Sequence, residues 1–552
     1  MKLLKSSLLA SAAGFAAVAG AQAADLPVKK AAPIEYVRVC SAYGAGFFYI
    51  PGTDTCIRLS GRARLDVGYQ PTSARSNNGS QGDTTGYIGL ARINVDARTQ
   101  TGYGTLRAFV RLQFASRTGA TGGLRSGTQE RIGSAFAAIG QDQGGRVQQF
   151  VNTDKAFIQF AGLTAGRASS FFDFYAHDFE FAGATANSDL QSTNLLAYTS
   201  KLGDGGLSAT VSLEDPSFRR NTINSQESTA AGALSRVLLS TNALGVPTFQ
   251  QIEVSQRNRM PDFVGVLRYD AAWGSAQLSA AVKELNTSNV IGTGSANVAG
   301  IVGLQNNFFA PGIVGPGARV SSEYGWAVQG GVKINMPFIA PGDTLYLQGA
   351  YGEGATLYTG YSSYNGSYTR SASTINGAAF DPYMADASLN PITGKIDLST
   401  SWTVVGSFLH YWAPEWRSAV FGSYGEMSFA RGAREANAAA YAGSGFAPGV
   451  NSAAFIGAPG SRAFALSPAL RDNYQFVAGG SIIWSPVKDL DIGLEGFYTK
   501  VGVQNGRVID QFNNGTLTAA QVNALTAAQA TSLRTVTASD TFQLRARVQR
   551  DF

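Results

Sequence analysis

Arginines recur at even-numbered spacings in several short segments of the first fifth of the chain. Because alternate residues of a β-strand point to the same face, this spacing predicts a wall of guanidinium groups. The candidates are Arg58, Arg62, Arg64, Arg92, Arg98, Arg107 and Arg111, with Arg167 near the end of a later segment and Arg545 and Arg547 close to the C-terminus. Such a wall would attract and orient solutes through its field and would perform no bond chemistry. The alternative is a set of scattered, solvated arginines that each pair locally.

Carboxylates fall in an aromatic segment that begins at Phe171. The stretch 171–183 carries Asp173, Asp178 and Glu180 among many aromatic residues, which is unusual for a loop exposed at a cell surface. We expect this stretch to pack inside the protein, with its carboxylates opposite the arginines. Opposed charges across a narrow, low-dielectric opening would orient dipolar solutes and water. The alternative is that the individual acids are simply solvated.

Histidine usage and the absence of known motifs argue against an enzyme. His177 and His410 are the only histidines, and they are far apart in sequence. We find no Gly-x-Ser-x-Gly elbow, no paired-histidine zinc spacing, no phosphate-binding glycine loop and no Cys-x-x-Cys motif. A dyad using His410 is conceivable in a membrane-embedded hydrolase, but an interfacial histidine on the apolar side of a strand is the simpler interpretation. We predict no catalytic residue, no metal and no cofactor.

The elements that must position these residues are strands with one apolar and one polar face. Period-2 alternation is the dominant pattern from residue 57 onward, and it predicts such strands. Sixteen segments follow it: 57–69, 86–98, 104–116, 153–161, 163–170, 193–200, 206–214, 261–271, 275–284, 323–335, 343–353, 400–411, 416–427, 473–485, 490–501 and 540–552. Single-chain bacterial barrels have an even number of strands. The sequence therefore predicts an all-β fold, a sixteen-stranded antiparallel transmembrane β-barrel.

The connections between these segments alternate in length. Short turns such as 412–415 and 486–489 alternate with long Gly-, Ser- and Asn-rich segments. That asymmetry is typical of a barrel with short periplasmic turns at one rim and long extracellular loops at the other. Composition agrees, because charged residues make up only 14% while the mean hydropathy is -0.03, and no apolar run past residue 23 approaches the length of a membrane-spanning helix.

The N-terminal residues predict export. Lys2 and Lys5 precede an apolar stretch and a small-residue cleavage site, so we interpret residues 1–23 as a signal peptide. Cys40 and Cys56 are the only cysteines and would form one disulfide in an oxidising compartment, the alternative being two free buried thiols. The predicted domains are the signal peptide 1–23, a disulfide-closed periplasmic-side segment 24–56 and the barrel 57–552.

Several stretches of the chain resemble the alphaproteobacterial porin family. They are Ala24-Asp-Leu-Pro-Val-Lys, the region from Tyr36 to Cys56, Gly166-Arg-Ala-Ser-Ser-Phe-Phe-Asp-Phe-Tyr175, Phe408-Leu-His-Tyr-Trp-Ala-Pro414 and Trp484-Ser-Pro-Val-Lys-Asp-Leu-Asp-Ile-Gly493. The resemblance implies homotrimeric sixteen-stranded barrels that pass small hydrophilic solutes, with a third loop folded inward as the constriction. The terminal Phe552 on an amphipathic final strand resembles the signal that the outer-membrane assembly machinery reads. The long segments near 215–260, 354–399 and 428–472 are less typical of the family.

These features predict a multi-pass protein of the cell outer membrane that forms a passive, water-filled channel. Expected partners are two further copies of the chain, outer-membrane lipid and lipopolysaccharide, the assembly machinery and small hydrophilic solutes. Nucleic acid is not expected, because a formal net charge of +6 is too mild for a concentrated basic face. Two alternatives remain open: a substrate-specific channel, and a surface adhesin or receptor that uses the barrel as an anchor.

Overall fold

The computed structural model describes most of the chain. The described residues are 38–71, 84–119, 139–140, 148–190, 192–224, 234–241, 247–253, 256–287, 322–361, 379–380, 382–444, 456–511, 513–514 and 517–552. The chain divides into one unit that ends at Ile57 and a second unit, 58–552, and each is treated by itself. The predicted signal peptide lies outside the described residues.

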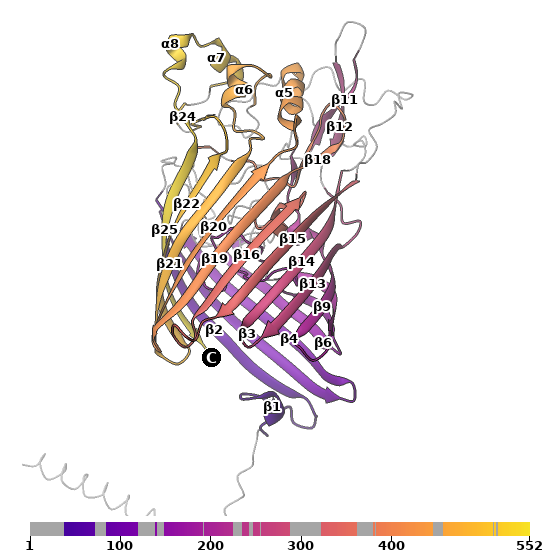
Figure 1. The fold of residues 1–552 in the computed structure, drawn as a ribbon, viewed down its shortest axis with the longest axis vertical. Coiled ribbons are helices and arrows are strands. Elements are labelled where there is room, and N and C mark those ends of the chain that lie inside the picture. Colours follow the sequence, from indigo (N-terminus) through magenta and orange to yellow (C-terminus); the bar gives the residue numbers. More distant parts are fainter. Residues whose placement is uncertain are drawn as a thin grey trace, which may run out of the picture. The chain divides into compact units, whose positions relative to one another are not determined.

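Sixteen strands of the described chain close into an antiparallel barrel, as the alternation predicts (Figure 1). They are β2 (Cys56–Tyr69), β3 (Thr85–Thr101), β4 (Gly104–Gly119), β6 (Gln148–Phe160), β7 (Leu163–Ala168), β8 (Thr193–Lys201), β9 (Leu207–Glu214), β13 (Asp262–Ala271), β14 (Gly274–Asn286), β15 (Ser322–Asn335), β16 (Thr344–Glu353), β19 (Thr400–Ala413), β20 (Trp416–Ser428), β21 (Asn473–Val487), β22 (Leu490–Val503) and β25 (Ala538–Asp551). Neighbours in sequence pair with each other, and β25 pairs with β2 to close the sheet. The predicted fold is confirmed. Observed strand ends differ by up to five residues, because backbone pairing continues past the alternating side chains.

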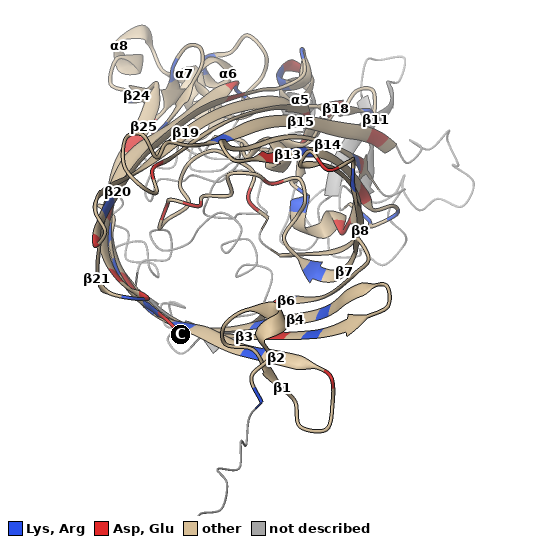
Figure 2. Ribbon diagram, turned by 60° about the horizontal axis from the view of Figure 1, so that its bottom comes forward, with Lys and Arg blue, Asp and Glu red and all other residues tan. Residues whose placement is uncertain are grey.

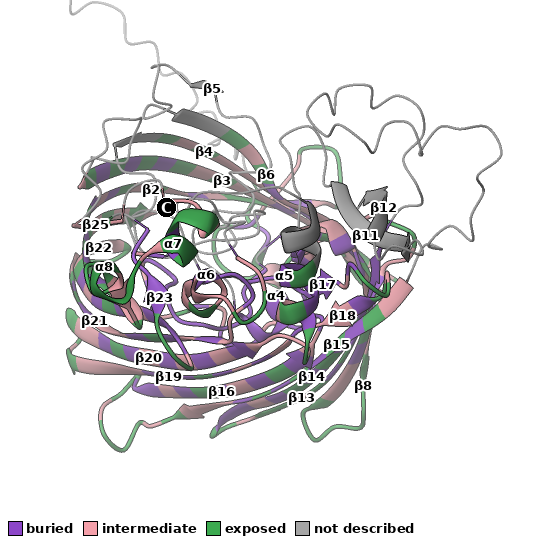
Figure 3. Ribbon diagram, turned by 90° about the horizontal axis from the view of Figure 1, so that it is seen from above, coloured by how far each residue is buried: buried purple, intermediate pink, exposed green. Residues whose placement is uncertain are grey.

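Buried and exposed residues alternate along the strands of the barrel wall (Figure 3). On β25, Phe542, Leu544 and Val548 are exposed on the outer face. Gln543 and Arg545 lie between them in sequence and are buried in the interior. Apolar groups outside and polar groups inside are the arrangement of a barrel that stands in lipid and encloses water.

The last residue takes part in the closure. The backbone amide of Phe552 donates to the carbonyl of Gly61 at 3.0 Å, and the amide of Gly61 donates back at 2.8 Å. The ring of Phe552 lies where a side chain at position 61 would be, 2.4 Å from an idealised Cβ. A glycine at this position therefore allows the terminal ring to cover the seam between β2 and β25.

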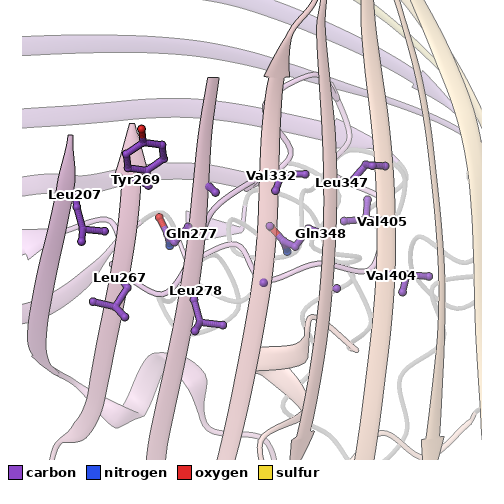
Figure 4. Close-up of a pocket in the computed structure, with 14 residues that line it drawn as sticks. Leu207, Leu267, Tyr269, Gln277, Leu278, Val332, Leu347, Gln348, Val404 and Val405 are labelled. Carbon is purple, nitrogen blue, oxygen red and sulfur yellow. The ribbon is translucent and has the colours of Figure 1, made fainter. Parts of the chain in front are cut away.

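One hollow on the outer face is apolar and lies over β9, β13–β16 and β19 (Figure 4). It has a volume of about 750 Å³, and Leu267, Leu278, Leu347 and Val404 are among its lining residues. The paired glycines Gly330 and Gly349 open it, because neither carries a side chain on that face. It belongs to the apolar exterior and not to the interior site.

The long connections contain regular structure, which their composition did not predict. Short strands β10 (Ile223–Asn224), β17 (Ala387–Leu389) and β18 (Ile396–Leu398) form a small sheet, β11 (Leu234–Thr241) pairs with β12 (Pro247–Glu253), and β23 (Val508–Ile509) pairs with β24 (Thr535–Val536). Helices are η4 (Pro216–Arg219), α4 (Thr356–Thr359), α5 (Ala433–Ser444), α6 (Arg462–Leu466), α7 (Ala519–Ala524) and α8 (Ala527–Ala530). Side-chain caps start several of them, for example a capping box at Thr518 and Gln521. None of the helices in the described ranges is long and apolar enough to span a membrane.

The N-terminal unit is closed by the predicted disulfide. Cys40 and Cys56 are bonded and buried, and their Cα atoms lie 6.0 Å apart. The unit also contains η1 (Ser41–Tyr43) and β1 (Phe48–Tyr49), which pairs with the start of β2.

Candidate pore constriction

The connection between β7 and β8, residues 169–190, lies inside the barrel; we call it the inner loop. Its backbone is held by polar side chains that project inward from successive strands. Gln277 on β14 donates to the carbonyl oxygens of residues 171–173 at 3.1–3.3 Å, and Gln329 on β15 donates to that of Phe172 at 3.0 Å. Gln348 on β16 accepts from the amide of Tyr175 at 3.0 Å. Buried backbone groups of the loop thus have partners on the barrel wall.

The second half of the inner loop is fixed to the strands further round the barrel. Ser423 on β20 accepts from the amide of Ala186 at 2.8 Å. Glu495 on β22 accepts from the amides of Phe181 and Ala182 at 2.5 and 2.8 Å. Together with the glutamines, these contacts hold the loop against the inside of β14, β15, β16, β20 and β22.

Aromatic packing supplies the apolar part of this attachment. Phe172 is fully buried and meets the ring of Tyr358 edge-on at 4.8 Å. Phe174 and Tyr175 pack against Tyr346, with ring centroids 5.6 and 5.1 Å apart. Gly331 makes room, because a Cβ there would stand 2.4 Å from the ring of Phe174. The aromatic composition of the segment is therefore explained by burial inside the barrel, as expected.

The middle of the inner loop is held by an ionised histidine. Both ring nitrogens of His177 face acceptors: Nδ1 lies 3.0 Å from Asp189, and Nε2 lies 2.8 Å from the carbonyl of Thr185. Two acceptors require two N–H donors, so the ring is the imidazolium. Burial opposes that charge, but Glu180 and Asp189 outweigh it and raise the pKa of His177 to about 9. The backbone at Ala176 and His177 is left-handed, with φ of 46° and 58°, and the histidine contacts hold this turn.

The predicted acids of the loop have defined partners. Asp173 forms an ion pair with Arg219 at 2.5 Å, with the two side chains 6% and 1% exposed. Glu180 accepts from the hydroxyl of Tyr175 at 3.0 Å and from the amides of residues 184 and 185. Asp178 accepts from the hydroxyl of Tyr346 at 2.8 Å. Burial raises the pKa of Asp178 above its ordinary value, despite that hydrogen bond.

Most arginines of the predicted basic wall lie on β2, β3, β4 and β25, and Figure 2 shows Lys and Arg positions recurring along β2, β3 and β4. Carboxylates of the same wall pair with most of its arginines. The pairs are Arg62 with Asp551 at 2.5 Å, Arg64 and Arg547 with Asp66 at 3.2 and 2.6 Å, Arg98 and Arg107 with Asp96 at 2.8 and 3.0 Å, and Arg111 with Asp154 at 3.5 Å. Asp66 and Asp96 share the parity of the arginines, so the alternative of local pairing applies to these members of the wall.

A polar cavity of about 470 Å³ is lined on one side by the inner loop and on the other by this wall. Of the predicted residues it is lined by Arg62, Arg64, Arg92, Arg111, Arg545, Arg547, Asp178 and Glu180. Arg58, Arg98, Arg107, Arg167 and Asp173 are not among its lining residues. Arg545 and Arg547 touch the loop directly, because both donate to the carbonyl of Phe181, at 3.2 and 3.0 Å. The structure thus brings eight of the thirteen predicted charges to one cavity.

Other residues that line the cavity were not among the predicted site residues. Arg417 and Asp491 form an ion pair at 2.7 Å between β20 and β22, and Asp189 reaches the cavity from the loop. Arg417 and Asp491 lie near the starts of the predicted strands 416–427 and 490–501, on the parity of their buried residues. His410 lies outside the cavity, 2.7 Å from Asp343 and edge-on to Trp412 at 4.4 Å. Within the described ranges, no group of three or more His, Cys, Asp or Glu residues is placed to hold a metal ion.

Comparison with known proteins places the chain in a family. A family model described as the porin subfamily matches residues 25–530. The chain belongs to this porin subfamily. Porin Omp2b of Brucella neotomae is 32% identical over 379 residues, which cover 65% of this chain and 88% of that porin. Omp2b of Brucella suis is 32% identical over 378 residues, covering 66% and 78%. The predicted alphaproteobacterial resemblance is confirmed.

Solved outer-membrane channels are similar to this porin at low identity. The outer membrane channel DcaP of Acinetobacter baumannii is 13% identical and covers 91% of this chain and 99% of its own, with a TM-score of 0.48. A complex of OmpF from Salmonella typhi is 12% identical over 91% of this chain and 99% of its own, with a TM-score of 0.36.

Proposed function

We propose that this porin forms a passive, water-filled channel for small hydrophilic solutes and ions in the outer membrane. The observation that carries the proposal is the inner loop, which is anchored inside a closed barrel and leaves a polar cavity against a basic wall. A channel sets limits of size and charge at its narrowest point, and the proposal assigns that point to this polar cavity. The proposed function is transport, and no enzymatic reaction is assigned to any residue.

Purified protein in a planar bilayer tests the channel. We expect stepwise, ohmic conductance in potassium chloride, since a water-filled lumen conducts without a bound carrier. Absence of conductance would overturn the proposal in favour of a plugged barrel that acts as a surface adhesin or receptor.

We further propose that the porin is a homotrimer. Two facts support it: membership of the porin subfamily, and a second apolar hollow of about 840 Å³ on the outer face near the closure seam. Its lining includes Leu65, Gly89, Ala91 and Phe114, and such a surface is suited to a neighbouring barrel. Migration as a trimer on a gel without heating, and as a monomer after heating, is the expected result.

A substrate-specific channel is the second candidate, and one observation favours it. Phe179 and Phe181 line the cavity beside charged groups, so an apolar face of a solute could bind there. A specific channel would show small currents that its solute blocks in a saturable manner, whereas a general porin would not.

A further inference from the structure

We infer that the cavity contains a binding site for small oxyanions, carboxylate or phosphate, centred on Arg62, Arg92 and Arg111. The inference rests on the proposed channel function and specifies the charge class of its solutes. The two sides of the cavity differ: the acids of the inner loop have partners in the loop or on the elements that hold it, whereas the arginines opposite are only partly neutralised.

Three acids of the inner loop line the cavity, and each has a partner within the protein. Asp173 is paired with Arg219 and does not line the cavity. Glu180 accepts from Tyr175 and from loop amides, and Asp189 faces the imidazolium of His177. The remaining acid, Asp178, is hydrogen-bonded by the hydroxyl of Tyr346. The loop carboxylates therefore serve mainly to hold the loop.

The arginines form two adjoining rows across β2, β3 and β4. In one row Asn94 bridges the wall, because it donates to Ser60 at 3.1 Å and accepts from Arg111 at 2.9 Å. The next residues on the same face make the second row, Arg62 and Arg92 with Gln113, the cross-strand partner of Arg92. Residues two apart on one face are separated by about 7 Å, and Arg62, Arg92 and Arg111 all line the same cavity.

Of the three arginines at the centre of the site, Arg92 has the least compensation by carboxylates of the described residues. With its amide turned to accept, Gln113 lies 2.9 Å from Nε of Arg92, so this partner is neutral. Among the described residues, none of the ion pairs includes Arg92. Arg111 has only a long contact of 3.5 Å to Asp154, while Arg98 on the same strand as Arg92 has Asp96 at 2.8 Å.

The chemistry of the site fits an oxyanion. Guanidinium groups bind carboxylate and phosphate in a bidentate manner, and such charge-assisted bonds are roughly twice as strong as neutral ones. The cavity lining holds seven arginines against four carboxylates, while Asp66, Asp154 and Asp551, which pair with some of these arginines, are not among the lining residues. Guanidinium groups therefore dominate the charged surface that an entering solute contacts, which favours an anion. A volume of about 470 Å³ accommodates a phosphate or a small organic acid with part of its water shell.

Ion selectivity of the native trimer and two matched variants tests the site. Arg92→Gln removes a cavity cation, and Arg98→Gln makes the same charge change on the same face of β3 outside the cavity. In a potassium chloride gradient we expect wild-type protein to favour chloride by about 3-fold, and Arg92→Gln to lower that ratio at least about 2-fold. Arg98→Gln should change it by less than about 1.3-fold, because Arg98 does not line the cavity and salt screens its charge from a passing ion.

Direct binding is measured by adding inorganic phosphate or succinate to one side of the bilayer. Either anion should reduce wild-type current in a saturable manner, and the reduction should be lost in Arg92→Gln. Arg92→Lys keeps the charge without the bidentate geometry; it should retain chloride preference and weaken the block. This variant also serves if Arg92→Gln does not assemble into heat-modifiable trimers.

The outcomes separate this inference from the channel proposal. Absence of conductance in the wild type contradicts both. Conductance with preference for potassium, equal effects of the two glutamine variants, or no block by either anion overturns the oxyanion site and leaves the channel intact.

Discussion

The two sides of the barrel interior hold their polar groups in opposite ways. Strands β14, β15 and β16 present the neutral amides of Gln277, Gln329 and Gln348, and each is bonded to the inner loop. Strands β2, β3 and β4 present arginines that face a polar cavity. Neutral groups can be buried at small cost once hydrogen-bonded, whereas charges need water or a counter-charge. The loop is therefore attached mainly through neutral groups, and the cavity is lined mainly by charged ones.

One buried ion pair lies on the side of the barrel interior where most polar groups are neutral. Its disruption should give the largest effect. Lys283 and Asp386 form a fully buried ion pair at 2.6 Å, and Asp386 also accepts from the amides of Asn221 and Thr356. Lys283→Met leaves a buried carboxylate uncompensated, which should cost about 3–5 kcal/mol. Urea unfolding of refolded protein measures this. Adding Asp386→Asn should recover much of the loss, and a single variant within about 1 kcal/mol of wild type would contradict the expectation.

Glu495 is the charged group of the attachment side that touches the loop tip. Glu495→Ala removes the acceptor of the amides of Phe181 and Ala182, at a cost of about 1–3 kcal/mol for each unpaired donor. The tip should then leave the wall, with larger and noisier single-channel conductance. Glu495→Gln keeps one acceptor oxygen, so its conductance and current noise should lie between those of wild type and Glu495→Ala. Identical traces for wild type and the alanine variant would show that other contacts alone hold the tip.

The imidazolium of His177 predicts a pH dependence of the loop. Its pKa of about 9 in the folded loop is above the ordinary value of 6.5, so charging stabilises the loop. That contribution is complete below pH 6.5, declines above it and is lost as the pH rises through about 9. Current noise should increase between pH 7 and pH 10. His177→Gln should show no such transition, and a wild-type channel with constant noise over this range would contradict the role.

Removal of one of the glutamine side chains that hold the inner loop should give the smallest effect. Gln277 donates to three loop carbonyls at 3.1–3.3 Å, and Gln277→Ala should cost about 0.5–1.5 kcal/mol because the carbonyls can bind water instead. Hydrogen exchange at the amides of the inner loop should rise slightly, with unchanged ion selectivity. If Gln277→Ala changed ion selectivity as much as substitution of a cavity arginine does, the division between residues that hold the loop and residues that line the cavity would be contradicted.

Alternation in the sequence by itself determined the barrel. Strands such as 416–427 and 490–501 were predicted within a few residues, because a period of two fixes which face meets lipid and which meets water. The same parity placed Arg62, Arg64, Arg92 and Arg111 on the interior. The disulfide followed from there being only two cysteines.

Only the tertiary structure determined which partners the charged residues have. Asp173 pairs with Arg219, and the backbone of Phe181 is hydrogen-bonded to Glu495 and Arg547. These partners are far apart in sequence, so no local sequence pattern predicts the contacts. The long connections fold into helices and small sheets because they pack on one another, and their composition alone did not show this. Parity assigns a side chain to a face, but its partner depends on which loop the closed barrel brings against it.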